Sequence, residues 1–161
     1  MKNLHKFTIY QISFAALVAA LYAALTLLLA PISFGPIQFR VSEALTLLPY
    51  CIPQSVPGLF VGCLVANVVG GFGIIDIVLG SLATLVAAWL TSKSPNVWIA
   101  ALPPVILNAL VVGTYVAIIS SIPIAPTMLY IGLSETVICY ALGVPLVLLI
   151  KRKDLVERFV K

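Results

Sequence analysis

Four charged residues lie among the long uncharged stretches of the chain, and a fifth, Lys93, lies in a polar turn. The candidates for chemistry are these four, Arg40, Glu43, Asp76 and Glu135, and two amides in similar surroundings, Asn67 and Asn108. A charged group in a membrane is costly unless it faces a partner or a hydrated cavity, so such a residue indicates a functional site by default. Three carboxylates against one guanidinium favour a cationic solute. An ionised carboxylate can also accept two parallel N–H bonds from a guanine-like base. We therefore expect these six side chains to form one substrate-binding pocket.

Each of these residues also has a purely structural interpretation. Arg40 and Glu43 are three positions apart and could pair along a helix, or Glu43 could stabilise a helix N-terminus. Asp76 follows a glycine-rich turn and could simply begin a helix at the membrane interface. The two amides could bond neighbouring helices. Glu135 is the strongest candidate, because it lies about two turns inside an apolar stretch with no basic residue within 15 positions.

The composition shows which kind of element must position these side chains. Apolar residues make up 62% of the 161 residues and charged residues 9%, whereas a soluble domain carries about 25% charge. The mean hydropathy is +1.19. These values exclude a soluble domain and a disordered chain. We predict an all-α integral membrane protein that forms a single domain over residues 1–161, with room for about six spans of ~20 residues.

Prolines, glycines and isolated charges divide the chain into the predicted spans. Pro49, Pro53 and Pro57 break the uncharged run 44–75, and a glycine cluster at 70–73 forms a turn. A polar turn follows at 92–96, and serines and prolines at 120–126 mark a further loop. The six predicted transmembrane spans cover about 7–30, 41–52, 56–70, 74–91, 97–119 and 128–150.

An even number of spans places both termini on one side of the membrane. The basic residues agree, because all but Arg40 then fall on that side, which the positive-inside rule makes cytoplasmic. They are Lys2, Lys6, Lys93, Lys151, Arg152, Lys153, Arg158 and Lys161. We expect a multi-pass protein of the bacterial inner or plasma membrane, with the six candidate side chains in its outer half.

Several other classes of function have no support in the sequence. The three cysteines and the single histidine, His5, do not cluster as metal ligands, and no Ser/His/Asp set is available for nucleophilic catalysis. A phosphate-binding loop of the type G-x-x-x-x-G-K-[ST] does not occur, nor does a basic stripe suited to nucleic acid. We therefore expect no enzymatic activity, metal, cofactor or nucleic-acid partner.

Small residues recur along the first predicted span. Ala16, Ala20 and Ala24 are spaced by four, and so are Ala15, Ala19 and Ala23. This spacing lets another helix approach closely. The partner could be a second protein or a helix of the same bundle.

Five blocks of the sequence resemble the QueT-type queuosine-precursor transporters. They are FGPIQFRVSEALTLLP (34–49), PGLFVGCLVAN (57–67), DIVLGSLATLVAAWLT (76–91), PPVILNALVVG (103–113) and IGLSETVICYALGVPL (131–146). That family consists of substrate-binding S components of energy-coupling factor (ECF) transporters. The first block is the most specific, and Ser134 departs from the glycine expected before Glu135.

The resemblance implies a six-helix S-component bundle and a 7-deazaguanine solute, such as preQ1 or queuine. It also implies three partner subunits: a transmembrane coupling protein and two ATPases, which would account for the missing phosphate-binding loop. The row Ala16, Ala20 and Ala24 resembles the surface that S components present to the coupling protein.

Other classes stay open at this point. One alternative is a self-sufficient secondary transporter of a small cationic solute, coupled to protons through Glu135 or Asp76. Most such carriers are built from repeats, and the sequence shows no evident repeat halves. A membrane enzyme or a purely structural subunit is a third possibility.

Overall fold

The computed structural model describes residues 9–34 and 38–152, and the structural statements below concern these residues. In this part of the chain the secondary structure is helical, without strands. The prediction of an all-α protein is confirmed. Several residues discussed above lie outside the described residues: the basic residues Lys2, Lys6, Lys153, Arg158 and Lys161, and His5.

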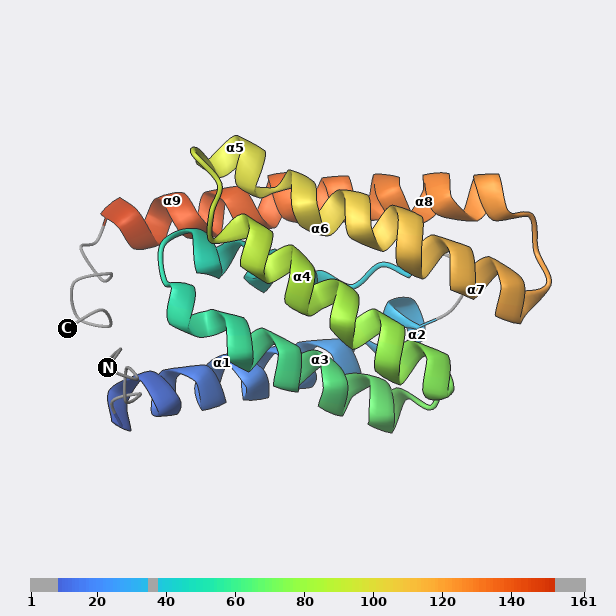
Figure 1. Ribbon diagram of the computed structural model, residues 1–161, viewed down its shortest axis with the longest axis horizontal. Helices are drawn as coiled ribbons and strands as arrows, with labels where there is room; N and C mark the ends of the chain where they lie inside the picture. Colours follow the sequence, from blue (N-terminus) through green and yellow to red (C-terminus); the bar gives the residue numbers. More distant parts are fainter. Residues whose placement is uncertain (1–8, 35–37, 153–161) are drawn as a thin grey trace, which may run out of the picture.

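The long helices lie side by side along the long axis of one elongated bundle (Figure 1). The first part of the chain forms α1 (Ile9–Leu28), the one-turn α2 (Ala30–Ser33) and the 3-10 helix η1 (Val41–Tyr50). The remaining helices are η2 (Pro53–Ser55), α3 (Val56–Gly70), η3 (Asp76–Gly80), α4 (Ser81–Thr91), α5 (Val97–Ala100), α6 (Leu102–Leu107), η4 (Asn108–Val112), α7 (Gly113–Ser120), α8 (Ile124–Ile138), η5 (Cys139–Gly143) and α9 (Val144–Arg152).

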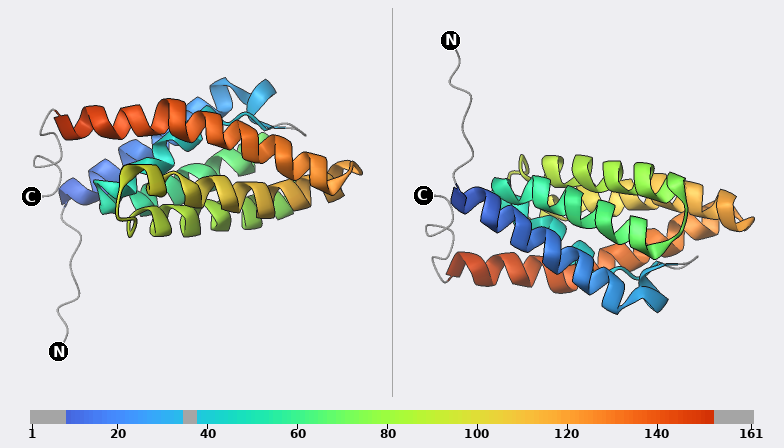
Figure 2. Two further views of the ribbon diagram at one scale, coloured as in Figure 1. Left: turned by 90° about the horizontal axis from the view of Figure 1, so that it is seen from above. Right: turned by 90° about the horizontal axis from the view of Figure 1, so that it is seen from below.

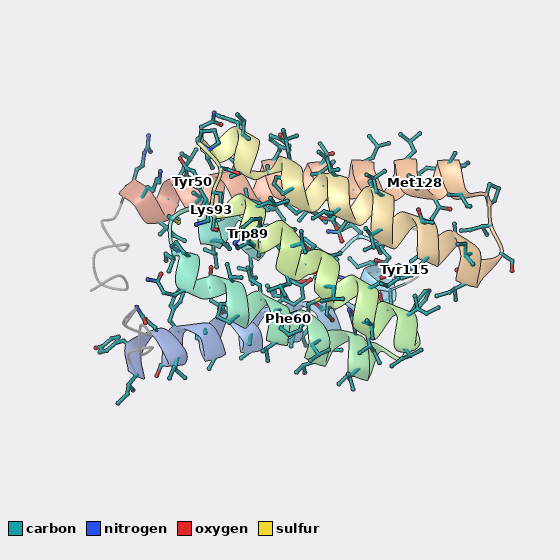
Figure 3. The ribbon with its side chains drawn as sticks, in the orientation of Figure 1. Tyr50, Phe60, Trp89, Lys93, Tyr115 and Met128 are labelled. Atoms are coloured by element: carbon teal, nitrogen blue, oxygen red, sulfur yellow. The ribbon has the colours of Figure 1, made fainter. Side chains whose placement is uncertain are left out.

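Four continuous helical stretches are long and apolar enough to cross a membrane. They cover Ile9–Leu28, Pro53–Gly70, Val97–Ser120 and Ile124–Arg152. The helical stretch Asp76–Thr91 is apolar but shorter, and η1 has only 10 residues. The six-span count and the cytoplasmic side of the termini therefore stay predictions. The start of α1 and the end of α9 lie at the same end of the molecule, and Lys93 lies toward that end (Figures 1 and 3).

Prolines and glycines shape the connections for physical reasons visible in the sequence. Pro53 begins η2 after the break that follows η1, since proline fits the first turn of a helix but not its interior. Gly71 and Gly73 form the predicted turn with φ of +71° and +105°, values that residues with a Cβ atom rarely adopt. One predicted loop is shorter than expected: α8 begins at Ile124, so Pro126 lies in its first turn.

Close backbone packing joins α1 to α3 (Figure 2). A Cβ atom on Gly58 would lie 2.3 Å from the carbonyl oxygen of Ala15, and one on Gly62 would lie 2.7 Å from that of Ala19. The half-buried row that contains Ala15 and Ala19 therefore packs against α3, at glycines that also recur every four residues. Such contact between backbones is how small residues join helices in lipid.

We expect Gly58→Ala to destabilise the protein by about 1–3 kcal/mol or more, because its Cβ would overlap backbone that cannot move alone. The measurement is the thermal melting of purified protein in detergent. Gly132→Ala is the matched control, since its Cβ would meet only the Ala109 side chain, at 3.2 Å. Equal melting temperatures for the two variants would contradict the close α1–α3 contact.

Candidate functional site

All six predicted site residues are buried, with exposed fractions of 5% or less. They come from different elements, which is why the sequence alone could not place them together. Arg40 directly precedes η1, Glu43 lies in the first turn of η1, Asn67 lies in α3, Asp76 begins η3, Asn108 begins η4 and Glu135 lies in α8.

The segment that carries Arg40 and Glu43 is held on both sides. The amide N–H of Phe39 donates to the carbonyl oxygen of Ile32 at 2.7 Å, and the hydroxyls of Thr26 and Ser42 lie 2.6 Å apart. On the α8 side, the Ser134 hydroxyl lies 3.0 Å from the carbonyl oxygen of Gln38. A glycine at position 134 could not make this bond, so the serine adds a contact next to the site.

Three short π-helical segments interrupt the helices close to the site residues. Asp76 is the first residue of η3 and Asn108 the first of η4, while η5 begins at Cys139, four residues after Glu135. Such segments are rare and occur frequently at functional sites. Their effect is to change which residues of a helix face the interior.

Glu43 is paired with a tyrosine from α1. The hydroxyl of Tyr22, a fully buried residue, donates to Glu43 Oε1, whereas Glu43 Oε2 has no hydrogen-bond partner in the protein. Arg40 also attracts this carboxylate. Only one oxygen of Glu43 is left for a ligand.

Asp76 has the same arrangement with a tyrosine from α7. The Tyr115 hydroxyl donates to Asp76 Oδ1, and Asp76 Oδ2 is buried without a partner. Tyr115 lies between α7 and α4 (Figure 3). A Cβ on Gly80 would lie 3.0 Å from the Tyr115 hydroxyl and 3.1 Å from Asp76 Oδ1, so a glycine leaves room for this contact.

Cys63 of α3 connects Arg40 with Asn67. Its sulfur lies 3.8 Å from Arg40 Nη1, 3.4 Å from Asn67 Nδ2 and 3.3 Å from the Thr84 hydroxyl. Arg40 also lies over the ring of Phe34, 5.3 Å from its centroid. The other two nitrogens of the guanidinium, Nε and Nη2, have no partner.

The second glutamate lies close to the first. The Asn108 side chain interacts with the carboxyl groups of both Glu43 and Glu135, and Arg40 attracts both. The Cys139 thiol lies 4.0 Å from Glu135 Oε2. Tyrosine hydroxyls donate to Glu43 and Asp76, whereas the contact of Glu135 is with a thiol.

The unpartnered atoms of the cluster define what it can bind. They are Arg40 Nε, Arg40 Nη2, Glu43 Oε2, Asn67 Oδ1 and Asp76 Oδ2. A buried polar atom without a partner costs about 1–3 kcal/mol, and native structures leave few of them. Their concentration among the predicted site residues indicates a site that a polar ligand completes. No group of three or more His, Cys, Asp or Glu residues suited to a metal occurs in the described part of the chain.

Sequence reasoning missed three residues of this cluster. Tyr22 and Cys63 lie in apolar helices without a distinguishing pattern, and Tyr115 is typical of an interface anchor or a core residue. Their roles depend on hydrogen bonds between residues that are 21 to 39 positions apart in the chain and lie in different helices. No local spacing could have indicated them.

A bundle of apolar helices around buried, partly unpaired charged groups is the architecture of a membrane transport protein. The family model for the QueT transporter matches residues 12–152, and the chain belongs to this family. Together with its membrane-length helices, this makes it a multi-pass protein of the cell membrane.

One curated relative is the "Queuosine precursor transporter QueT" of Lactococcus lactis subsp. cremoris (strain MG1363). It is 42% identical over 79 residues, which are 48% of this chain and 46% of the relative. The similarity thus spans about half the length of that relative. No solved structure matches the chain.

Proposed function

We propose that this chain is the substrate-binding S component of an ATP-driven ECF-type importer, and that it takes up a queuosine precursor of the 7-deazaguanine type. The observation that carries the proposal is the set of unpartnered buried atoms, which combines two donors on Arg40 with acceptors on Glu43, Asn67 and Asp76. The family and the name of the relative support the choice of solute.

The chemistry of the solute matches this set of atoms. A guanine-like base offers a carbonyl oxygen as acceptor next to N–H donors, and a carboxylate accepts parallel N–H bonds. Three carboxylates against one guanidinium leave an excess of negative charge, which a ligand amine would reduce. preQ1 and queuine both combine such a base with an amine.

We expect the isolated chain to bind preQ1 without ATP. The ligand would satisfy buried atoms that otherwise lack partners, so binding should release heat and raise the melting temperature. Calorimetry and thermal melting in detergent measure both, and adenine is the control because its amino group stands where guanine has a carbonyl. If every deazapurine gave neither heat nor a thermal shift, the ligand assignment would be wrong.

The alternative is a proton-coupled carrier, and one observation favours it. Glu43 and Glu135 are close enough to interact and share Asn108, so a proton could bind to this pair. Reconstituted vesicles separate the two functions. An importer subunit needs ATP and its partners for uptake, whereas a carrier accumulates solute with a pH gradient alone.

The partner surface in this proposal is the outward row of alanines on α1. Ala16, Ala20 and Ala24 are exposed, whereas the alternate row packs against α3. A groove of about 410 Å³ between α1 and α3 is lined by Ala16 together with Ala15 and Ala19. A transmembrane coupling protein, which would connect this subunit to two ATPases, could approach closely at these alanines because their side chains are small.

A further inference from the structure

We propose that the polar site has two subsites of different chemistry: Asp76 and Asn67 bind the positively charged amine of the ligand, while Arg40 and Glu43 bind its base. This inference rests on the proposed function, because it assigns parts of the same ligand to parts of the same site. It goes further in stating which end of the cluster each ligand group occupies.

The Asp76–Asn67 subsite contains free acceptors and no free donor. Asn67 Nδ2 donates to the carbonyl oxygen of Asp76 at 3.0 Å, which sets the orientation of the amide and leaves Oδ1 unpartnered. The Tyr115 hydroxyl is used on Asp76 Oδ1, which leaves Oδ2. Both Asn67 and Asp76 are fully buried. An ammonium group suits this subsite, because it has three donors, no acceptor and the opposite charge.

The Arg40–Glu43 subsite combines free donors with a free acceptor. Arg40 Nη1 lies toward Cys63, so Nε and Nη2 remain, and Glu43 contributes Oε2. A carbonyl oxygen beside an N–H group, as in the amide edge of a guanine-like base, matches donors beside an acceptor. The two subsites are connected, since Cys63 contacts both Arg40 and Asn67.

The test compares two ligands that share the base and differ in charge. 7-Aminomethyl-7-deazaguanine carries an ammonium, and 7-cyano-7-deazaguanine is neutral. Calorimetry on the purified full chain gives the ratio of the two affinities for the parent and for Asp76→Asn, which keeps an acceptor for Tyr115. We expect Asp76→Asn to lower the preference for the amine by about tenfold or more, the size of one charge-assisted hydrogen bond.

Glu43→Gln is the matched comparison, because it also neutralises one buried carboxylate. It should weaken both ligands and keep their ratio within about threefold. Gly80→Ala is the second variant if Asp76→Asn does not fold. Its Cβ would come within 3.0–3.1 Å of Asn67 Nδ2, the Tyr115 hydroxyl and Asp76 Oδ1, all at side-chain ends, so it should displace the acceptors and lower the preference by about threefold or more.

The outcomes distinguish this inference from the proposed function. If both ligands bind the parent but neither Asp76→Asn nor Gly80→Ala alters the ratio, the subsite assignment is wrong and the function stands. If Glu43→Gln lowers the ratio as much as Asp76→Asn, the amine is not confined to the Asp76 end and the assignment is also wrong. If neither ligand binds the parent, the proposed function fails, and the subsites fail with it.

Discussion

Glu135→Gln and Glu43→Gln should each weaken binding of preQ1 by about 30-fold or more. Both carboxylates are buried, and removing one partner of a buried charged hydrogen bond at an interface costs about 2–5 kcal/mol. The contacts of these residues also explain why the fold should tolerate either substitution. Glutamine at position 43 keeps an oxygen for the Tyr22 hydroxyl, and neutralising either residue removes the repulsion between the two carboxylates. Calorimetry and thermal melting in detergent, done in parallel, measure affinity and stability.

Thr136→Val is the control for these variants. Thr136 is next to Glu135 but exposed, and its hydroxyl bonds only the Gly132 carbonyl of its own helix, so the variant should bind like the parent. Parent-like affinity in both glutamine variants would show that the glutamates have structural roles only. A large loss of stability in the absence of ligand would lead to the same conclusion.

Ala20→Trp should abolish co-purification with the coupling protein and ATP-dependent uptake, while leaving the affinity for preQ1 close to that of the parent. Ala20 lies in the exposed row of α1, and a large ring there would prevent close approach of a partner helix. The contact of α1 with Glu43 is made from its buried side, by Tyr22. The measurements are pull-down with the coupling module, uptake in vesicles and calorimetry.

Val137→Trp is the matched control, because Val137 is 55% exposed on α8, away from the alanine row. It introduces the same ring on another apolar face and should affect neither assembly nor binding. Assembly of Ala20→Trp at the parent level would refute the interface. If Ala20→Trp lost ligand binding together with assembly, the exposed row would have a structural role in the subunit itself.

The helical class and the six polar candidates follow from the sequence for one physical reason. Hydrocarbon accepts a backbone only when its polar groups are bonded within the chain, so long apolar runs must be helices. Charged side chains within such runs must be buried or hydrated, and Arg40, Glu43, Asp76 and Glu135 are indeed buried. The turn at Gly71 and Gly73 is predictable for a different, local reason: glycine adopts positive φ without a steric cost.

Contacts between distant helices were decided by the tertiary structure alone. The two alanine rows have the same spacing, and only the positions of Gly58 and Gly62 show that the row of Ala15 and Ala19 contacts α3 while that of Ala16, Ala20 and Ala24 is exposed. In the same way, Tyr22 and Tyr115 each occupy one carboxylate oxygen and leave the other free. Spacing along one helix defines its faces but not what packs against them, so the binding chemistry of this site depends on the packing of the whole bundle.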